Sequence, residues 1–263
     1  MFPSRRSLLA GALTLAAAPA RSAPYPWPDG ARGAVSLTYD DGLDSQLTNA
    51  VPALQAARLK GTFFLVQENM EARLADWQKV ARLGHEIGDH TETHPCLLGS
   101  FNAASFERRQ IAPMERFLNR NFGRQTGRVF AYPCGFLGLG HGSASLRDGR
   151  YDEVVARDFS AARTVDGPPI DPAQAKRDRL HLAGFEPTYD ADDPGPGFAY
   201  LQTAMDQGRW AILVFHEVLP ARVGEGDTSI AVHGRILDFI KRQPLWCAPM
   251  GEVFRHVAGV HVA

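Results

Sequence analysis

Short apolar segments alternate with longer amphipathic segments along most of the chain, and this alternation constrains the fold more than any other feature. Such a pattern is typical of repeated βα units, whose strands lie parallel in one sheet. The expected strands are short, and several are rich in β-branched or aromatic residues: Val35–Tyr39, Thr62–Val66, Glu86–Asp89, Val129–Tyr132, Phe159–Thr164, Trp210–Phe215 and Leu245–Ala248.

Amphipathic helical patterns fill the intervals between these strands: Leu47–Leu59, Asp76–Leu83, Phe106–Arg120, Tyr151–Arg157 and Ile230–Arg242. Two stretches rich in Gly, Pro and Asp are expected to be long surface loops: Gly135–Gly149 and Glu186–Gly197. The alternation therefore predicts one α/β domain, built as a barrel or as a doubly wound sheet.

The N-terminal segment differs from the rest of the chain. Arg5-Arg6 precedes an apolar run, Leu8–Ala18, and small residues then offer a cleavage site after Ala20 or Ala23. This pattern predicts an export signal over residues 1–23, similar to the twin-arginine type, and a catalytic domain over 24–263. The run is about half as long as a bilayer span requires, so we expect no stable membrane anchor and a periplasmic or secreted protein.

Charge and cysteine content limit the partners and the scaffold. The formal net charge is -1, so no global positive field is available to attract nucleic acid, and no feature implies a protein partner. Three cysteines are too few for a disulfide framework. At most one bridge can form, and Cys96 with Cys134 is a candidate pair near the polar residues described next.

Polar residues cluster where the expected strands end. Asp40-Asp41-Gly42 follows the first strand, His90 the third, Pro133-Cys134-Gly135 the fourth and His216 the sixth. In a parallel barrel these ends converge on one face, which is where active sites are built. Asp-Asp-Gly alone is also common in turns, so its position rather than its composition indicates a site.

Two histidines and one carboxylate form a candidate metal site. His90 and His94 are four residues apart, and one helical turn would place both on the same face. With Asp41 they leave the fourth position of a tetrahedral Zn²⁺ site for water, although Co²⁺ or another divalent ion is an alternative. The same ligand set occurs in Fe(II) oxygenases, so it does not name the reaction.

Two further residues suit proton transfer. Adjacent residues of a strand point in opposite directions, so Asp40 can handle protons while Asp41 binds the metal. His216 follows an apolar strand and could be a buried hydrogen-bonding residue. It could equally act as a general acid, because imidazole exchanges protons near neutral pH.

Four motifs in this order resemble those of the polysaccharide deacetylase family: Thr38-Tyr39-Asp40-Asp41-Gly42, His90-Thr91-Glu92-Thr93-His94, Phe130-Ala131-Tyr132-Pro133-Cys134-Gly135 and Leu213-Val214-Phe215-His216. The resemblance runs from about Val35 to His216. It implies a single-domain, distorted (β/α) barrel with seven or eight parallel strands and an acetylated carbohydrate as substrate. It also implies that Asp40 is the general base, that Asp41, His90 and His94 bind the metal, and that His216 is the general acid.

The resemblance assigns further residues and shows two departures. The backbone N–H of Cys134 would bind the oxyanion, Val214 would line an acetyl pocket, and Tyr132 would contribute to substrate binding. Many members have an aromatic residue at the Cys134 position and an arginine where this chain has Ala131. That arginine normally pairs with the catalytic aspartate, and Arg163 at the end of the fifth expected strand is a candidate replacement.

The predicted function is therefore metal-dependent removal of N- or O-linked acetyl groups from a carbohydrate polymer or oligomer. One alternative keeps the metal but changes the substrate to a small amide or cyclic imide. Another is a secreted carbohydrate-binding module without turnover. An oxygenase fits less well, since its usual β-sandwich would lack the βα alternation.

Overall fold

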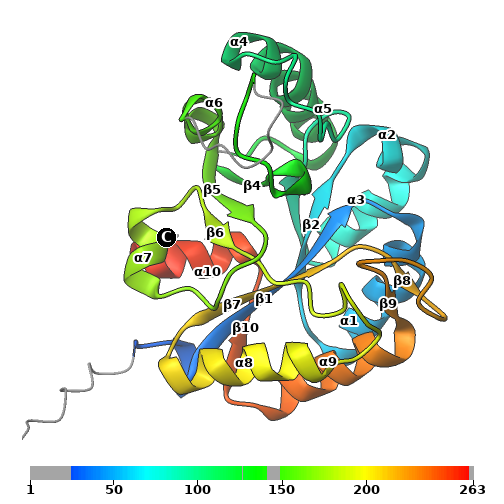
Figure 1. Cartoon of the computed structure of the whole chain (residues 1–263). Helices are drawn as coiled ribbons and strands as arrows, with labels where there is room; N and C mark the ends of the chain where they lie inside the picture. The colour runs from blue at the N-terminus through cyan, green and yellow to red at the C-terminus, as the bar shows by residue number, and fades with distance from the viewer. Residues whose placement is uncertain (1–24, 126, 141–148, 261–263) are drawn as a thin grey trace, which may run out of the picture.

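A computed structural model describes residues 25–125, 127–140 and 149–260, and shows a parallel barrel surrounded by helices (Figure 1). The predicted export signal and part of the predicted loop 135–149 lie outside the described residues. Seven strands form the barrel: β1 (Gly33–Asp41), β2 (Gly61–Leu65), β3 (Glu86–Asp89), β4 (Arg128–Ala131), β5 (Phe159–Thr164), β6 (Leu182–Ala183) and β7 (Trp210–Phe215). The predicted single-domain, distorted (β/α) barrel is confirmed.

The strands follow one another in sequence order from β1 to β6, and β7 returns to pair with β1. The ring closes just after β6, where Phe185 pairs with Leu213 of β7. Two backbone hydrogen bonds of 2.9 Å make this closure, from Phe185 N–H to the Ile212 carbonyl and from Val214 N–H to the Phe185 carbonyl. The strand β10 (Leu245–Cys247) pairs only with the first three residues of β1, which distorts the barrel at that end.

Helices cover the outside of the barrel: α1 (Val51–Ala57), α2 (Gln67–Met70), α3 (Leu74–Arg82), α4 (Ala103–Phe106), α5 (Ala112–Phe122), α6 (Arg150–Asp158), α7 (Pro172–Arg177), α8 (Gly195–Gln207), α9 (Ile230–Arg242) and α10 (Met250–Ala258). Short 3₁₀ turns occur at Pro28–Gly30, Glu71–Arg73 and Pro133–Gly135, and a small β8 (Val218–Leu219) pairs with β9 (Thr228–Ser229).

The structure corrects several predicted boundaries. The helices α7, α8 and α10 were not predicted, and α8 begins inside the stretch expected to be a loop up to Gly197. The predicted helix Phe106–Arg120 is divided by a π-helical segment, Glu107–Ile111, and a second π segment, Gln46–Ala50, precedes α1. Each π segment comes just before a proline, Pro113 or Pro52, which has no N–H to continue the regular hydrogen bonding.

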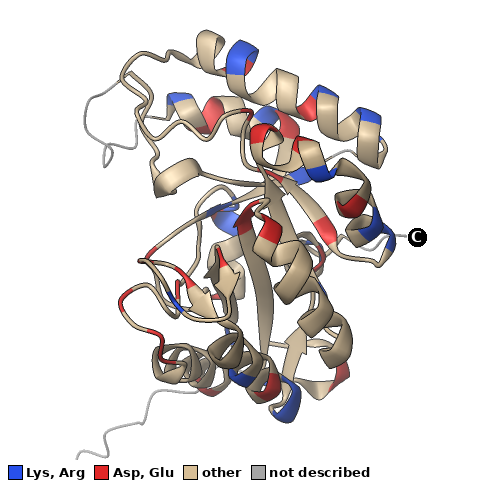
Figure 2. Ribbon diagram, turned by 90° about the vertical axis from the view of Figure 1, so that its right-hand side faces the viewer, with Lys and Arg blue, Asp and Glu red and all other residues tan. Residues whose placement is uncertain are grey.

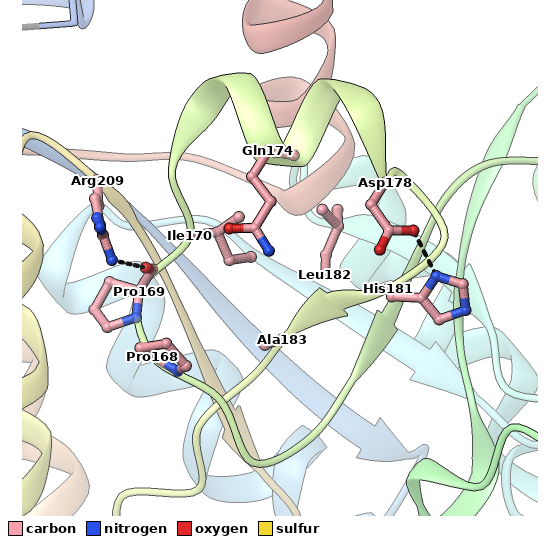
Figure 3. A pocket seen from close by; sticks show the side chains of 10 residues that line it. Pro168, Pro169, Ile170, Gln174, Asp178, His181, Leu182, Ala183 and Arg209 are labelled. Carbon is pink, nitrogen blue, oxygen red and sulfur yellow. Dashed lines mark hydrogen bonds and ion pairs between the residues drawn. The ribbon is translucent and has the colours of Figure 1, made fainter. Parts of the chain in front are cut away.

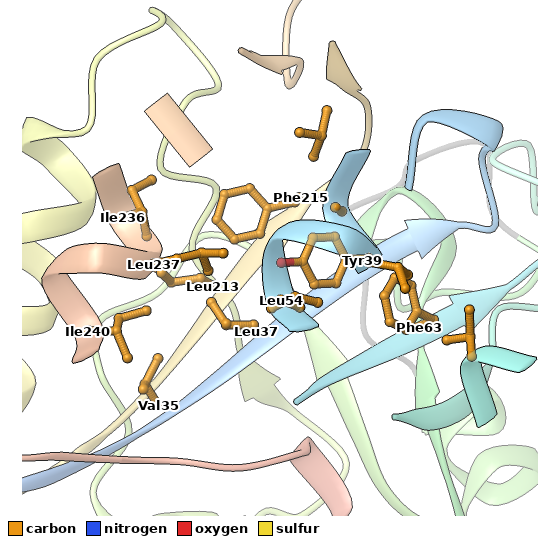
Figure 4. Packing of buried hydrophobic residues seen from close by; sticks show 14 of the residues in the cluster. Val35, Leu37, Tyr39, Leu54, Phe63, Leu213, Phe215, Ile236, Leu237 and Ile240 are labelled. Carbon is orange, nitrogen blue, oxygen red and sulfur yellow. The ribbon is translucent and has the colours of Figure 1, made fainter. Parts of the chain in front are cut away.

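Successive side chains of β1 point alternately toward the surrounding helices and into the barrel interior. Val35, Leu37 and Tyr39 are fully buried in a cluster with α1, α9 and β7 (Figure 4). The residues between them therefore point into the barrel, since successive strand side chains face opposite ways. Thr38 donates there to the Leu213 carbonyl at 2.8 Å, and Asp40 follows on the same face.

Charged side chains are distributed over the outer helices. Basic and acidic residues are interspersed there, as Figure 2 shows. This mixture agrees with the nearly balanced charge of the sequence. Among the described helices, none is both long and apolar enough to span a bilayer.

Candidate active site

The end of β1 places two adjacent aspartates in different surroundings. Asp40 still has strand geometry and is buried inside the barrel, with 4% of its surface exposed. Asp41 has a φ of 76°, so the chain turns sharply there into Gly42. This left-handed conformation is unfavourable for a residue with a Cβ, and such strain is concentrated at functional sites. The turn directs the two carboxylates to separate positions.

The segment from His90 to His94 is a loop, which differs from the helical turn that the spacing suggested. Thr91 and His94 have φ values of 73° and 49°, and the Thr91 hydroxyl accepts a hydrogen bond from the His94 N–H at 3.1 Å. The Thr91 N–H in turn donates to the Asp89 carboxylate at 2.7 Å. A hydrogen-bonded, left-handed loop thus brings the two imidazoles together, with ring centroids 4.7 Å apart.

Asp41, His90 and His94 meet with the spacing of a metal site. The Oδ1 atom of Asp41 lies 3.6 Å from Nε2 of His90 and 3.5 Å from Nε2 of His94. Bonds of about 2.0–2.1 Å to a tetrahedral ion would place such ligand atoms about 3.3 Å apart. The three ligand atoms therefore fit a divalent ion with only small adjustments.

The surroundings of His90 prepare it as a ligand. Its Nδ1 lies 2.8 Å from the carbonyl of Ala131, which fixes the proton on Nδ1 and leaves the Nε2 lone pair facing Asp41. Burial lowers the pKa of His90 to about 4, despite the opposing charges of Asp40 and Asp41. The imidazole is thus neutral near pH 7, which is the form that binds a metal.

Asp40 has one occupied and one free carboxylate oxygen. Its Oδ2 forms an ion pair with Arg163 and lies 3.7 Å from Nε2 of His90 and 4.0 Å from Nε2 of His216. Its buried Oδ1 has no hydrogen-bond partner among the described residues. Burial favours the protonated acid, but Arg163, His90 and His216 together outweigh it and lower the pKa of Asp40. Asp40 is therefore an ionised acceptor with one oxygen available.

Arg163 reaches Asp40 from the strand next to Ala131. Ala131 and Arg163 are direct register partners on β4 and β5. The guanidinium is fully buried, lies 5.2 Å from the centroid of the Phe64 ring and is accommodated beside Gly184. A Cβ at Gly184 would lie 3.2 Å from Cδ of Arg163. Small residues on the neighbouring strands thus provide the space that this arginine fills.

His216 directly follows β7, and 29% of its side chain is exposed. Gln46 was not predicted as a site residue, yet its amide donates to the carbonyls of both Asp40 and His216. Glu186 was also not predicted. Burial raises its pKa, and the charge of nearby His216 offsets only part of this increase. Neither residue belongs to a recognisable motif, so only their spatial positions reveal them.

Cys134 lies in the turn after β4 with a φ of 55°, and a disulfide joins it to Cys96. The Cα atoms of the pair are 5.7 Å apart. Because Cys96 is two residues after His94, the bond connects the metal-site loop to the turn expected to bind the oxyanion. Cys247 is the remaining, free cysteine.

Residues 28–141 match the family model named polysaccharide deacetylase, and this range contains Asp40 and the three candidate metal ligands, Asp41, His90 and His94. Over this range, which is less than half of the chain, the sequence is similar to the polysaccharide deacetylase family.

One curated relative is similar to part of the chain. A peptidoglycan-N-acetylglucosamine deacetylase of Bacillus cereus is 40% identical over 87 residues, which are 33% of this chain and 31% of the relative. The chain thus matches less than a third of the length of that relative.

Solved structures share the fold at low sequence identity. A Mycobacterium smegmatis protein assigned to the polysaccharide deacetylases has a TM-score of 0.67 at 18% identity, covering 90% of this chain and 94% of its own. A family 4 carbohydrate esterase from Streptomyces lividans, in complex with acetate, has a TM-score of 0.58 at 16% identity, covering 84% and 93%. At this identity the two structures support the barrel fold.

Two substrate-binding residues expected for a polysaccharide deacetylase are buried. The Tyr132 side chain is 1% exposed and packs edge-on against Phe130 and Tyr151, outside the barrel. This burial does not favour the expected contact between the Tyr132 side chain and a substrate. Val214 is also 1% exposed and lies beside Gly184, where it could form only the floor of an acetyl pocket.

A separate cavity of about 60 Å³ lies between α7 and β6 (Figure 3). Its lining includes Ile170, Gln174 and Arg209, and the Arg209 guanidinium donates to the Pro169 carbonyl at 3.3 Å. None of the predicted site residues lines this cavity. It is large enough for little more than ordered water, so we assign the chemistry to the strand ends.

Proposed function

We propose that this chain is an exported, metal-dependent hydrolase that removes acetyl groups from a carbohydrate, with N-acetylglucosamine polymers as the first candidates. Support comes from the family-model match over residues 28–141, from the similarity to the Bacillus cereus relative and from the ligand spacing at the strand ends. The single observation that carries the proposal is the free Oδ1 of Asp40, an ionised and buried acceptor directly beside the metal ligands.

Asp41, His90 and His94 would hold the divalent ion, most simply Zn²⁺. When bound, such an ion polarises the acyl oxygen and makes water a better nucleophile at neutral pH. These three side chains offer one carboxylate oxygen and two imidazole nitrogens, which is the donor set of catalytic rather than structural zinc.

Asp40 would act as the general base. Its Oδ1 accepts the proton of the attacking water, while Arg163 holds Oδ2 and keeps the carboxylate ionised beforehand. Because Arg163 is fully buried, it orients Asp40 without itself being free to contact the substrate. We therefore propose Arg163 as a positioning residue, replacing the arginine expected at Ala131.

His216 would act as the general acid, and Cys134 would bind the developing oxyanion. Nε2 of His216 is close enough to Asp40 for both to act on one acyl carbon, and its partial exposure leaves it open to a leaving amine or alkoxide. The backbone N–H of Cys134 would stabilise negative charge on the acyl oxygen. Val214 would form the floor beneath the acetyl methyl, where limited space disfavours longer acyl groups.

Acetate release tests this proposal. The mature protein is incubated with N-acetylglucosamine oligomers, peptidoglycan, acetylated xylan and a small cyclic imide, with chelator and with added Zn²⁺. We expect release from at least one acetylated carbohydrate, which chelator abolishes and Zn²⁺ restores. Turnover of the imide alone would favour the amidase alternative, and binding of glycan without acetate release would favour a binding module.

A further inference from the structure

The Cys96–Cys134 disulfide lies directly against a residue of the candidate metal site. The Sγ atom of Cys96 is 3.7 Å from Nδ1 of His94. Both sulfur atoms and this nitrogen lie within 4.8 Å of one another. Cys134 is exposed and Cys96 is partly exposed, so solvent and small reductants can reach the bond.

His94 faces two sets of donor atoms with its two ring nitrogens. Its Nε2 points to Asp41, at 3.5 Å, and its Nδ1 points to Cys96. A neutral imidazole has only one nitrogen with a free lone pair, because the other carries the proton. His94 can therefore bind a metal through Nε2 or through Nδ1. Which nitrogen binds depends on whether Cys96 and Cys134 form a disulfide or are free thiols.

We propose that reduction of this disulfide creates a second metal site, formed by Sγ of Cys96, Sγ of Cys134 and Nδ1 of His94. A dithiol supplies two electrons and two protons, so the S–S bond breaks, both cysteines become thiols and the dithiol becomes a disulfide. A thiophilic divalent ion such as Zn²⁺, Co²⁺ or Cd²⁺ then replaces the two thiol protons, which leave to solvent. Two sulfurs, one imidazole nitrogen and water complete a four-coordinate site.

The backbone can accommodate this change. Zn–S bonds of about 2.3 Å in a tetrahedral site require the two sulfurs to be about 3.8 Å apart. The Cα atoms of Cys96 and Cys134 are 5.7 Å apart, so rotation of the side chains is sufficient to reach that separation. The new site competes with Asp41 and His90 for His94. This consequence, a redox-controlled loss of the hydrolytic metal, rests on the proposed function.

Cobalt spectroscopy tests the new site without an activity assay. All samples carry Cys247→Ser, which removes the only other thiol. The protein is reduced with a phosphine, desalted without oxygen and titrated with Co²⁺ beside an oxidised sample. We expect near-ultraviolet thiolate-to-cobalt absorption in the reduced sample alone, lost on reoxidation. No such band at saturating Co²⁺ would overturn the proposal.

Matched variants assign the ligands. Cys96→Ser and Cys134→Ser should each abolish or strongly weaken the band. In His94→Ala, the Co²⁺ affinity measured from this band should fall at least tenfold. A full band in both serine variants, or an unchanged band-derived affinity in His94→Ala, would contradict the assignment. The comparison of oxidised with reduced samples uses the same Cys247→Ser chain throughout, so it does not depend on the folding of the three ligand variants. Failure here leaves acetate release untested, so the two proposals can fail independently.

Discussion

Arg163 on β5 forms an ion pair with Asp40 on β1, across the interior of the barrel. Its neighbour in register is Ala131, the position at which many family members have arginine. We propose that Arg163 takes the place of the arginine that the family resemblance leads us to expect at Ala131, because it supplies a positive charge to the same carboxylate from the adjacent strand.

Replacing Arg163 with methionine should raise the pKa of Asp40. Burial favours the neutral acid and the arginine opposes it, so without the cation the carboxylate is ionised only at higher pH. The acidic limb of kcat/KM should therefore move to higher pH, with activity below neutral pH reduced about tenfold or more. A pH profile of acetate release measures the shift, and an unmoved acidic limb would contradict this role for Arg163.

Moving the arginine back provides a matched control for that variant. In the double variant Ala131→Arg/Arg163→Ala, a guanidinium again enters the barrel from an adjacent, registered position. We expect the acidic limb to return toward its wild-type position. Thermal unfolding of both variants distinguishes a shifted pH profile from a general loss of stability.

The metal set predicts how metal content responds to substitution. Asp41→Ala and His94→Ala each remove one of three ligands, so bound metal after dialysis should fall from one ion per chain to a small fraction. Plasma mass spectrometry of the dialysed proteins measures this directly. Retention of a full equivalent of metal by both variants would exclude this set as the primary site.

Buried His233 should make folding sensitive to mild acid. Its Nε2 lies 2.8 Å from the Tyr39 hydroxyl, and burial lowers its pKa to about 4. In the unfolded chain the His233 imidazole takes up a proton at higher pH than it does in the folded protein. The folding free energy that depends on neutral His233 is therefore fully present above about pH 6.5 and is lost as the pH falls toward 4.

His233→Gln keeps a partner for Tyr39 but does not titrate. Between pH 7 and pH 5 the wild type should lose about 2 kcal/mol more unfolding free energy than the variant. Urea unfolding at the two pH values measures this difference, and parallel losses in both proteins would contradict it.

The sequence alone predicted six of the seven barrel strands, and β10, with small errors at their ends, because most of them are short apolar runs between polar residues. It missed β6, since a strand of only two residues leaves no periodic pattern in the sequence. It missed α8 and α10, since a helix that buries much of its surface, as α8 does at Tyr200, Leu201 and Ala204, lacks a clear polar face. The π segments were also missed, because they depend on local hydrogen bonding that periodicity does not record.

Some residues of the candidate site could also be predicted from the sequence, and others could not. Asp40, Asp41, His90 and His94 could be chosen because strand ends converge, whereas Gln46 and Glu186 could not, because each enters the site from an element without a motif. The helical turn expected for the two histidines was wrong, since i,i+4 spacing is equally compatible with a left-handed loop held by Thr91. Spacing indicated proximity correctly but gave the wrong backbone.

The most direct test of the account is the Asp40→Asn variant, loaded with one equivalent of Zn²⁺ and assayed on the best wild-type substrate. Asp40 is placed beside the metal ligands rather than among them, so the variant should bind metal like the wild type. Its acetate release should nevertheless fall about a hundredfold or more, because the base is lost. Near-wild-type acetate release by the metal-loaded variant would contradict the proposed division of roles between Asp40 and Asp41.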